Sequence, residues 1–160
     1  MILGMTTYTF IHVLLSLVGI ASGFIVLGGL LQSKPLNGWT AVFLLTTIAT
    51  SVTGFGFPFT QLLPSHIVGL ISLVILAIAC IARYPLHLAG AWRWIYVVAA
   101  AIALYFNVFV GVVQAFQKIP ALRALAPTQS EPPFAIAQGA VLLMFVVLGF
   151  LATRKFHPAV

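Results

Sequence analysis

Hydrophobic residues in this chain fall into five long runs, separated by short segments rich in proline, glycine and polar residues. The runs cover residues 7–31, 39–57, 66–84, 92–117 and 134–153. Each is close to the roughly 20 residues that an α-helix needs to cross the hydrocarbon core of a bilayer. Strands of a membrane barrel would instead alternate over about 10 residues. The pattern predicts an all-α membrane protein, a compact bundle of about five transmembrane helices forming one domain over residues 1–160.

The longest connection between runs, residues 118–133, contains four prolines. Proline interrupts a helix because it lacks the backbone N–H and its ring is bulky. Within this connection, residues 119–126 are expected to form one or two helical turns that lie along the membrane surface.

Composition supports a membrane environment. Of the 160 residues, 62% are hydrophobic and 5% are charged, and the mean hydropathy is +1.21. A soluble domain carries about 25% charged residues, so the lipid bilayer must surround most of this chain. The formal charge of +6 comes from basic residues scattered singly between apolar runs. They form no patch that could follow a phosphate backbone, which excludes nucleic acid as a partner.

The same basic residues predict the orientation in the membrane. With five crossings, one face carries Lys34, Arg83, Arg93, Arg154 and Lys155. The opposite face carries Lys118 and Arg123, together with Glu131, which is the single acidic residue. Cytoplasmic loops carry an excess of Lys and Arg. We therefore expect the N-terminus outside and the C-terminus in the cytoplasm.

Small residues recur at helical spacing in the first and second runs. Gly19 and Gly23 match the GxxxG pattern, and threonines repeat between Thr46 and Thr53. Such residues allow membrane helices to approach closely. We interpret them as packing surfaces within the bundle, which also allow a homodimer or assembly into a larger membrane complex.

Larger polar side chains gather at the predicted outer ends of the helices, and they are the candidate ligand-binding residues. Positions four, seven and eleven residues apart share one face of a helix, as do Asn107, Gln114 and Lys118. Amide and ionisable groups are costly inside a membrane unless they are paired or hydrated. The candidate set comprises His12, His66, Gln114, Lys118, Glu131 and Gln138.

The residue types limit the chemistry. One carboxylate excludes the paired-acid hydrolysis of sugars, and the absence of aspartate excludes a Ser-His-Asp triad. His12 and His66 are candidate metal ligands, either for zinc together with Glu131 or as the two axial ligands of a b-type haem. A quinone-like ligand is a further candidate. Its ring could lie in an aromatic slot built from Phe55, Phe57, Phe59, Tyr105 and Phe106.

Three segments resemble motifs of small, uncharacterised bacterial inner-membrane proteins: residues 54–59, 63–66 and 126–134. The resemblance covers the middle and last thirds of the chain. It implies a location in the bacterial inner membrane, but it comes with no assigned activity or cofactor.

The leading hypothesis is a periplasm-facing pocket that binds a haem or quinone-like ligand, with a role in electron transfer or ligand binding. His12 and His66 would contact the ligand, and Gln114, Lys118 and Glu131 would tune its protonation and charge. Two alternatives are a non-catalytic accessory or scaffold subunit of a membrane complex and a small oligomeric transporter or channel.

Overall fold

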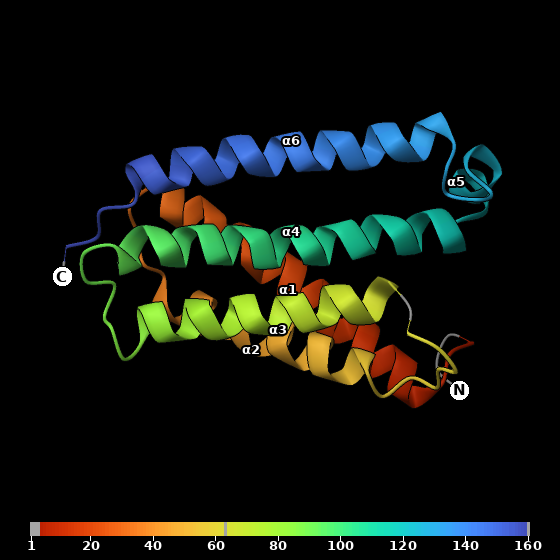
Figure 1. The fold of residues 1–160 in the computed structure, drawn as a ribbon, viewed down its shortest axis with the longest axis horizontal. Coiled ribbons are helices and arrows are strands. Elements are labelled where there is room, and N and C mark those ends of the chain that lie inside the picture. The colour runs from red at the N-terminus through yellow and green to blue at the C-terminus, as the bar shows by residue number, and fades with distance from the viewer. Residues whose placement is uncertain (1–3, 63, 160) are drawn as a thin grey trace.

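The computed structural model describes residues 4–62 and 64–159, which form six helices and no strand. Leu63, part of one motif singled out above, lies outside the described residues. The helices are α1 (Thr7–Leu31), α2 (Asn37–Gly54), α3 (Pro64–Arg83), α4 (Trp92–Lys118), α5 (Pro120–Leu125) and α6 (Pro132–Lys155). The five long helices run up and down along one axis, so that the two chain ends lie at opposite ends of the bundle (Figure 1). The prediction of an all-helical bundle is confirmed.

Four helices in the described part of the chain, α1, α3, α4 and α6, are long and apolar enough to cross a membrane. The sequence predicts about five crossings, and α2 is the predicted crossing that is not among these four helices. Its 18 residues include five threonines, a serine and an N-terminal asparagine, which lower its hydropathy. α2 nevertheless lies lengthwise beside α1 and α3, with the same orientation as the other long helices (Figure 1).

Local sequence explains where the helices begin and end. The Thr6 hydroxyl accepts a hydrogen bond from the backbone N–H of Thr9 at the start of α1, as N-cap residues do. Both α3 and α6 begin at a proline, where the missing N–H costs no helical hydrogen bond. α2 ends at Gly54, three residues earlier than the apolar run predicts, and its start at Asn37 is two residues earlier. The short α5 confirms the predicted helical turns within residues 119–126.

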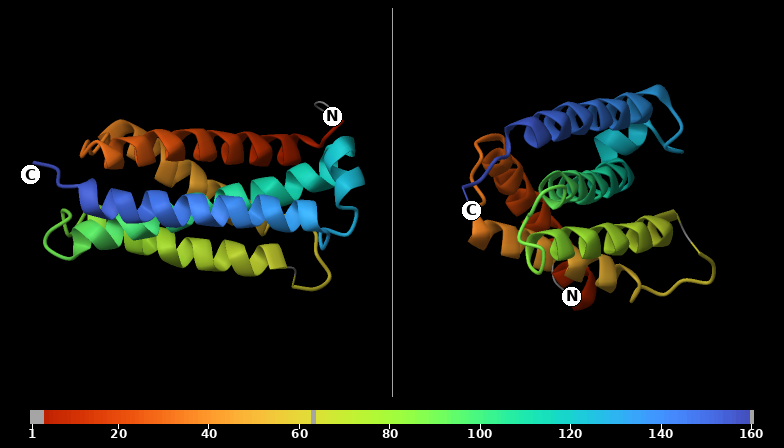
Figure 2. Two further views of the ribbon diagram at one scale, coloured as in Figure 1. Left: turned by 90° about the horizontal axis from the view of Figure 1, so that it is seen from above. Right: turned by 60° about the vertical axis from the view of Figure 1, so that its left-hand side comes forward.

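α4 occupies the middle of the bundle and contacts α1, α3, α5 and α6. α6 lies at the periphery and packs against α4 and α1 (Figure 2). Large apolar side chains on the outside of α6 remain exposed, among them Ile136, Leu143 and Phe150. Because a bilayer solvates such side chains, this exposed surface fits a lipid environment.

The GxxxG stripe of α1 makes the closest helix contacts. A Cβ on Gly19 would lie 3.2 Å from the Thr47 hydroxyl of α2. A Cβ on Gly23 would collide with Leu104 of α4 and lie 2.9 Å from the Phe43 ring of α2. The stripe therefore packs inside the bundle, as its spacing predicts, and brings α1 against both α2 and α4.

We predict that Gly23→Val destabilises the bundle by about 1–3 kcal/mol, because the added atoms overpack the contact with Phe43 and Leu104. Gly28→Val is the matched control on the same helix, since a Cβ there meets nothing within 4 Å. Its effect should stay within about 0.5 kcal/mol. Unfolding in detergent checks both, and equal destabilisation by the two variants would contradict the contact described here.

Candidate functional site

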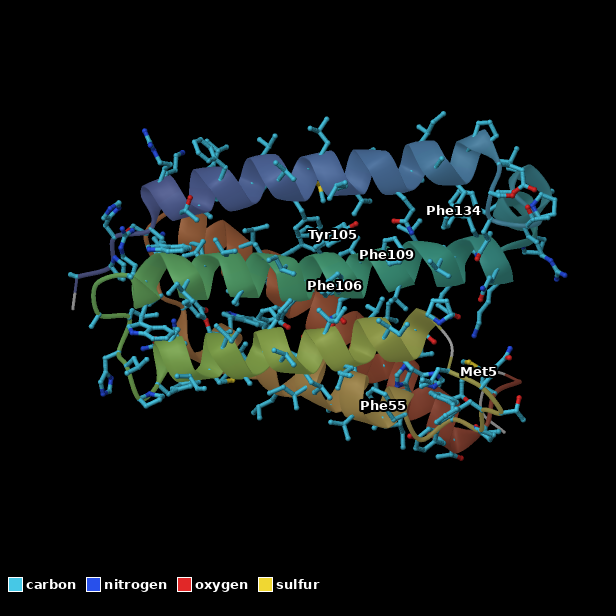
Figure 3. All side chains as sticks on the ribbon, viewed as in Figure 1. Met5, Phe55, Tyr105, Phe106, Phe109 and Phe134 are labelled. Atoms are coloured by element: carbon cyan, nitrogen blue, oxygen red, sulfur yellow. The ribbon has the colours of Figure 1, made fainter. Side chains whose placement is uncertain are left out.

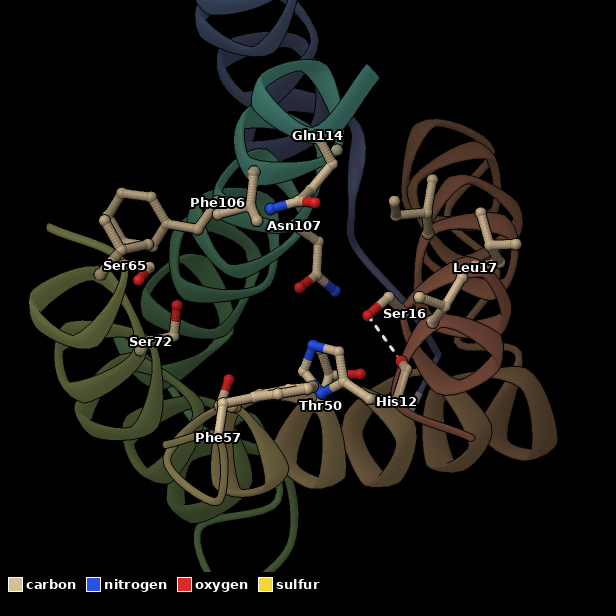
Figure 4. A pocket seen from close by; sticks show the side chains of 18 of the residues that line it. His12, Ser16, Leu17, Thr50, Phe57, Ser65, Ser72, Phe106, Asn107 and Gln114 are labelled. Atoms are coloured by element: carbon tan, nitrogen blue, oxygen red, sulfur yellow. Dashed lines mark hydrogen bonds between the residues drawn. The ribbon is translucent and has the colours of Figure 1, made fainter. Parts of the chain in front are cut away.

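A cavity of about 450 Å³ opens between α1, α2, α3 and α4 at the end of the bundle that holds the ends of α2 and α4. Along α1 its lining runs from Thr9 to Ile20, an axial length of roughly 16 Å at 1.5 Å per residue. The cavity is therefore about half as long as a hydrocarbon core is thick, which is about 30 Å. Apolar residues form much of its wall, and polar side chains project into it from all four helices (Figure 4).

His12 is the titratable side chain that α1 contributes to the cavity. Its Nδ1 atom lies 2.8 Å from the Thr53 hydroxyl of α2, and the Phe57 ring stands edge-on to the imidazole at 5.0 Å. The Tyr8 hydroxyl donates to the Thr53 backbone carbonyl at 2.5 Å. These contacts fix the ring so that its other nitrogen faces the cavity, across from Asn107 (Figure 4).

α4 places three polar side chains on the opposite wall: Asn107, Gln114 and Lys118. The Asn107 amide donates to the Thr47 hydroxyl of α2 at 3.2 Å, which holds the deepest of the three. Gln114 and Lys118 are exposed within the opening, and neither side chain has a hydrogen bond to another described residue. The shared face that the sequence spacing predicts is confirmed.

Two aromatic rings, Phe57 and Phe106, border the cavity. The other aromatic residues that the sequence suggested for such a slot lie elsewhere. Tyr105 packs against Phe145 of α6, with ring centroids 5.8 Å apart, on the α6 side of α4 (Figure 3). Phe55 and Phe59 pack against His66.

His66 does not line the cavity. It is buried at the start of α3, where its ring lies 4.2 Å from the Phe59 centroid and 5.7 Å from the Phe55 centroid. Across residues 4–62 and 64–159, no three His, Cys, Asp or Glu side chains gather in a group that could hold a metal ion. The structure thus gives His12 and His66 separate surroundings.

Gln138 and Glu131 also lie away from the cavity lining. The Gln138 amide donates to the Phe109 backbone carbonyl at 3.1 Å, a contact that joins α6 to α4. Glu131 accepts hydrogen bonds from the Thr128 hydroxyl at 2.8 Å and from the Ser130 backbone N–H at 3.1 Å. Its carboxylate orders the turn before α6. Of the six candidate residues, His12, Gln114 and Lys118 are brought together, and the other three are not.

Sequence reasoning missed the α3 wall of the cavity, which is formed by Ser65, Val68, Gly69 and Ser72. Their signal was present, because Ser65, Gly69 and Ser72 are four and three residues apart and so share one helix face. It also treated Arg83 only as a marker of orientation. Arg83 is 8% exposed, and its Nη2 atom donates to the Asn37 side chain at 2.6 Å and to the Pro35 carbonyl at 3.0 Å.

Comparison with protein-family models, with curated proteins and with solved structures finds no match for this chain. The resemblance to small bacterial inner-membrane proteins therefore stays a prediction, and the function is inferred from the geometry of the cavity.

The turn around Glu131 should depend on ionisation of its carboxyl group. Desolvation acts to raise the pKa of Glu131, but hydrogen bonds from the Thr128 hydroxyl and from backbone amides outweigh it and lower the pKa from its ordinary 4.5. A lowered pKa in the folded state means that the ionised form stabilises the turn. That contribution is fully present above pH 4.5 and is lost as the pH falls through the lowered value.

We predict that Glu131→Gln speeds amide hydrogen exchange at Thr128 and Ser130 at pH 7, while exchange in α1 and α2 is unchanged. The difference from the natural protein should shrink as the pH falls through the lowered pKa of Glu131, because the natural carboxyl group then also becomes neutral. Faster exchange along the cavity wall would instead link Glu131 to the cavity.

Proposed function

We propose that the protein binds a lipid-soluble, quinone-like ligand in the cavity between α1 and α4. The observation that carries this proposal is the ring nitrogen of His12 that faces the cavity between Phe57 and Phe106. Small-molecule sites are mostly apolar, measure roughly 300–1,000 Å³ and contain a few polar groups that fix the orientation of the ligand. A cavity of about 450 Å³ meets that description.

The wall chemistry supports a flat ring with polar substituents. Phe57 and Phe106 provide apolar faces for a ring, and Asn107 and Gln114 provide amides that can either donate or accept. Leu17 and Ile20 continue the lining deeper along α1, where an apolar tail can lie. A haem would have His12 as its one histidine ligand here, since His66 packs outside the cavity. The geometry therefore favours the quinone-like ligand over a haem with two histidine ligands.

The proposal includes α2 as a fifth membrane crossing. Its threonines are less costly in lipid than their hydropathy implies, because their hydroxyls donate to backbone carbonyls one turn earlier. The Thr46 hydroxyl lies 2.7 Å from the Val42 carbonyl, and the Thr53 hydroxyl lies 2.7 Å from the Ala49 carbonyl. Thr40 and Thr47 are fully buried within the bundle.

With five crossings, the end of the bundle opposite the cavity carries five of the seven Lys and Arg residues. Cytoplasmic loops carry an excess of these residues, which supports a cavity mouth at the outer face of the membrane. The N-terminus then lies outside and the C-terminus lies in the cytoplasm. This placement puts the ligand within reach of electron carriers in the bilayer or at its outer surface, which suits a role in electron transfer.

Binding tests the proposed function directly. Detergent-purified protein is titrated with a short-chain benzoquinone and, separately, with its quinol under anaerobic conditions, and binding is measured by isothermal titration calorimetry. We expect at least one redox form to bind, and His12→Phe to weaken that binding at least about tenfold, the equivalent of one lost hydrogen bond at a well-ordered site.

His66→Phe is the matched control, because it removes the other outer imidazole at a position that does not line the cavity. Binding unaffected by His12→Phe, or lost equally in both variants, would contradict the proposal.

Co-purification with a larger complex and no binding would favour the accessory-subunit alternative. Solute flux in proteoliposomes that disappears in Asn107→Leu would favour a transporter. An absorbance spectrum of the oxidised and dithionite-reduced protein reports any haem.

Orientation is a separate prediction. Reporter enzymes fused after Thr60 and after Thr128 should both report the outer face, and fusions in the 85–90 loop and after residue 157 should report the cytoplasm. A fusion after Lys34, which precedes α2, should also report the cytoplasm. If α2 does not cross the membrane, the fusions after Lys34 and after Thr60 will report the same face, which would remove the fifth crossing.

A further inference from the structure

We propose that His12 makes the cavity selective for the reduced, hydroxyl-bearing form of its ligand, a quinol, over the oxidised carbonyl form. The inference rests on the proposed function, because it concerns the same cavity. The inference follows from the position of the Thr53 hydroxyl proton, because that position determines which ring nitrogen of His12 carries a proton.

The Thr53 hydroxyl has three close neighbours. Its oxygen lies 2.7 Å from the backbone carbonyl of Ala49, 3.2 Å from that of Thr50 and 2.8 Å from Nδ1 of His12. A hydroxyl has a single proton, and a carbonyl oxygen has none to give. Two oxygens cannot lie 2.7 Å apart favourably without a proton between them. The hydroxyl proton must therefore point back to the carbonyls of α2, which leaves the Thr53 oxygen as an acceptor towards His12.

The tautomer of His12 follows from this arrangement. Nδ1 must donate to Thr53, and a neutral imidazole carries only one N–H group. The other nitrogen, Nε2, is then a pure acceptor with a lone pair. It faces the cavity (Figure 4) and has no hydrogen-bond partner among the residues that the structure describes. A contact to one ring nitrogen commonly sets the role of the other in this way.

A lone pair at this position distinguishes the two redox forms of a quinone. A quinol hydroxyl can donate a hydrogen bond to Nε2, whereas a quinone carbonyl would place its own lone pairs against that of the nitrogen. Sites that hydrogen-bond a substrate group reject analogues that lack it, because a buried polar group is then left unpaired. Asn107 keeps a second amide N–H and its carbonyl oxygen beside its bond to Thr47, so it can serve either form without turning. The Gln114 amide can turn to serve either form, and Lys118 donates to an oxygen of either. Selectivity therefore falls to His12.

The preference has a consequence for redox energetics. Reduction of a quinone takes up two electrons and two protons, and tighter binding of the product favours reduction of the bound molecule. A tenfold preference for the quinol raises the midpoint potential of the bound couple by about 30 mV relative to the free couple.

The test compares the affinity of a short-chain benzoquinone with that of its quinol, held reduced under anaerobic conditions. We expect the natural protein to bind the quinol at least about tenfold more tightly. Thr53→Val keeps the shape of the side chain but removes the acceptor for Nδ1, so either tautomer becomes accessible and the preference should fall below about threefold. Thr53→Ser is the matched variant that keeps the hydroxyl and should restore the preference.

A second readout needs no ligand. Nitrogen-15 chemical shifts of the His12 ring should report a proton on Nδ1 in the natural protein and in Thr53→Ser, and a mixture of tautomers in Thr53→Val. Equal affinities for the two redox forms, tighter binding of the quinone, or a proton on Nε2 in the natural protein would overturn the inference while leaving ligand binding in place. Binding of neither form would contradict the proposed function, and with it the inference.

Discussion

The polar side of this bundle depends on one kind of hydrogen bond, in which threonine hydroxyls of α2 donate to backbone carbonyls of the same helix. Inside a membrane, a polar group must find its partners within the protein. Thr46 and Thr53 donate to carbonyls one turn earlier, so their oxygens remain free to accept from neighbouring helices. Thr53 uses this capacity to hold His12 of α1. Among the long helices of the described residues, the one that falls short of the hydropathy of a candidate membrane span is therefore also the helix that orients the candidate site.

Glycine on α1 makes this arrangement sterically possible. Gly19 lies close enough to α2 and α4 for Thr47 and Asn107 to reach one another beside it. The glycine stripe therefore brings the helices together beneath the cavity, while bulkier residues such as Phe57 and Phe106 line its wall.

The sequence was sufficient to predict most of the fold, because hydropathy over long runs is a strong signal and segments that contain proline separate most of these runs. It also predicted the shared face of Asn107, Gln114 and Lys118, since helical spacing determines which side chains point the same way. The depth of a residue in the membrane was a weaker guide to whether its side chain lines the cavity. His66 and Gln138 lie at the expected end of the bundle, but rotation about the helix axis directs them to Phe59 and to the Phe109 backbone. Rotation of one helix against another depends on packing between helices, which no single run of residues reveals.

At the end of the bundle opposite the cavity, residues that follow α6 pack against the other helices. Phe156 follows α6 and is completely buried. Its ring packs on Tyr96, and its backbone carbonyl accepts from Arg93. The next residue, His157, donates its backbone N–H to Ser33 at 2.8 Å. Because these residues are synthesised after every helix, the part of Tyr96 that Phe156 covers stays exposed while the ribosome is still adding α6. Assembly at this end is therefore completed only after insertion of the last helix, even if the helices around the cavity have already packed.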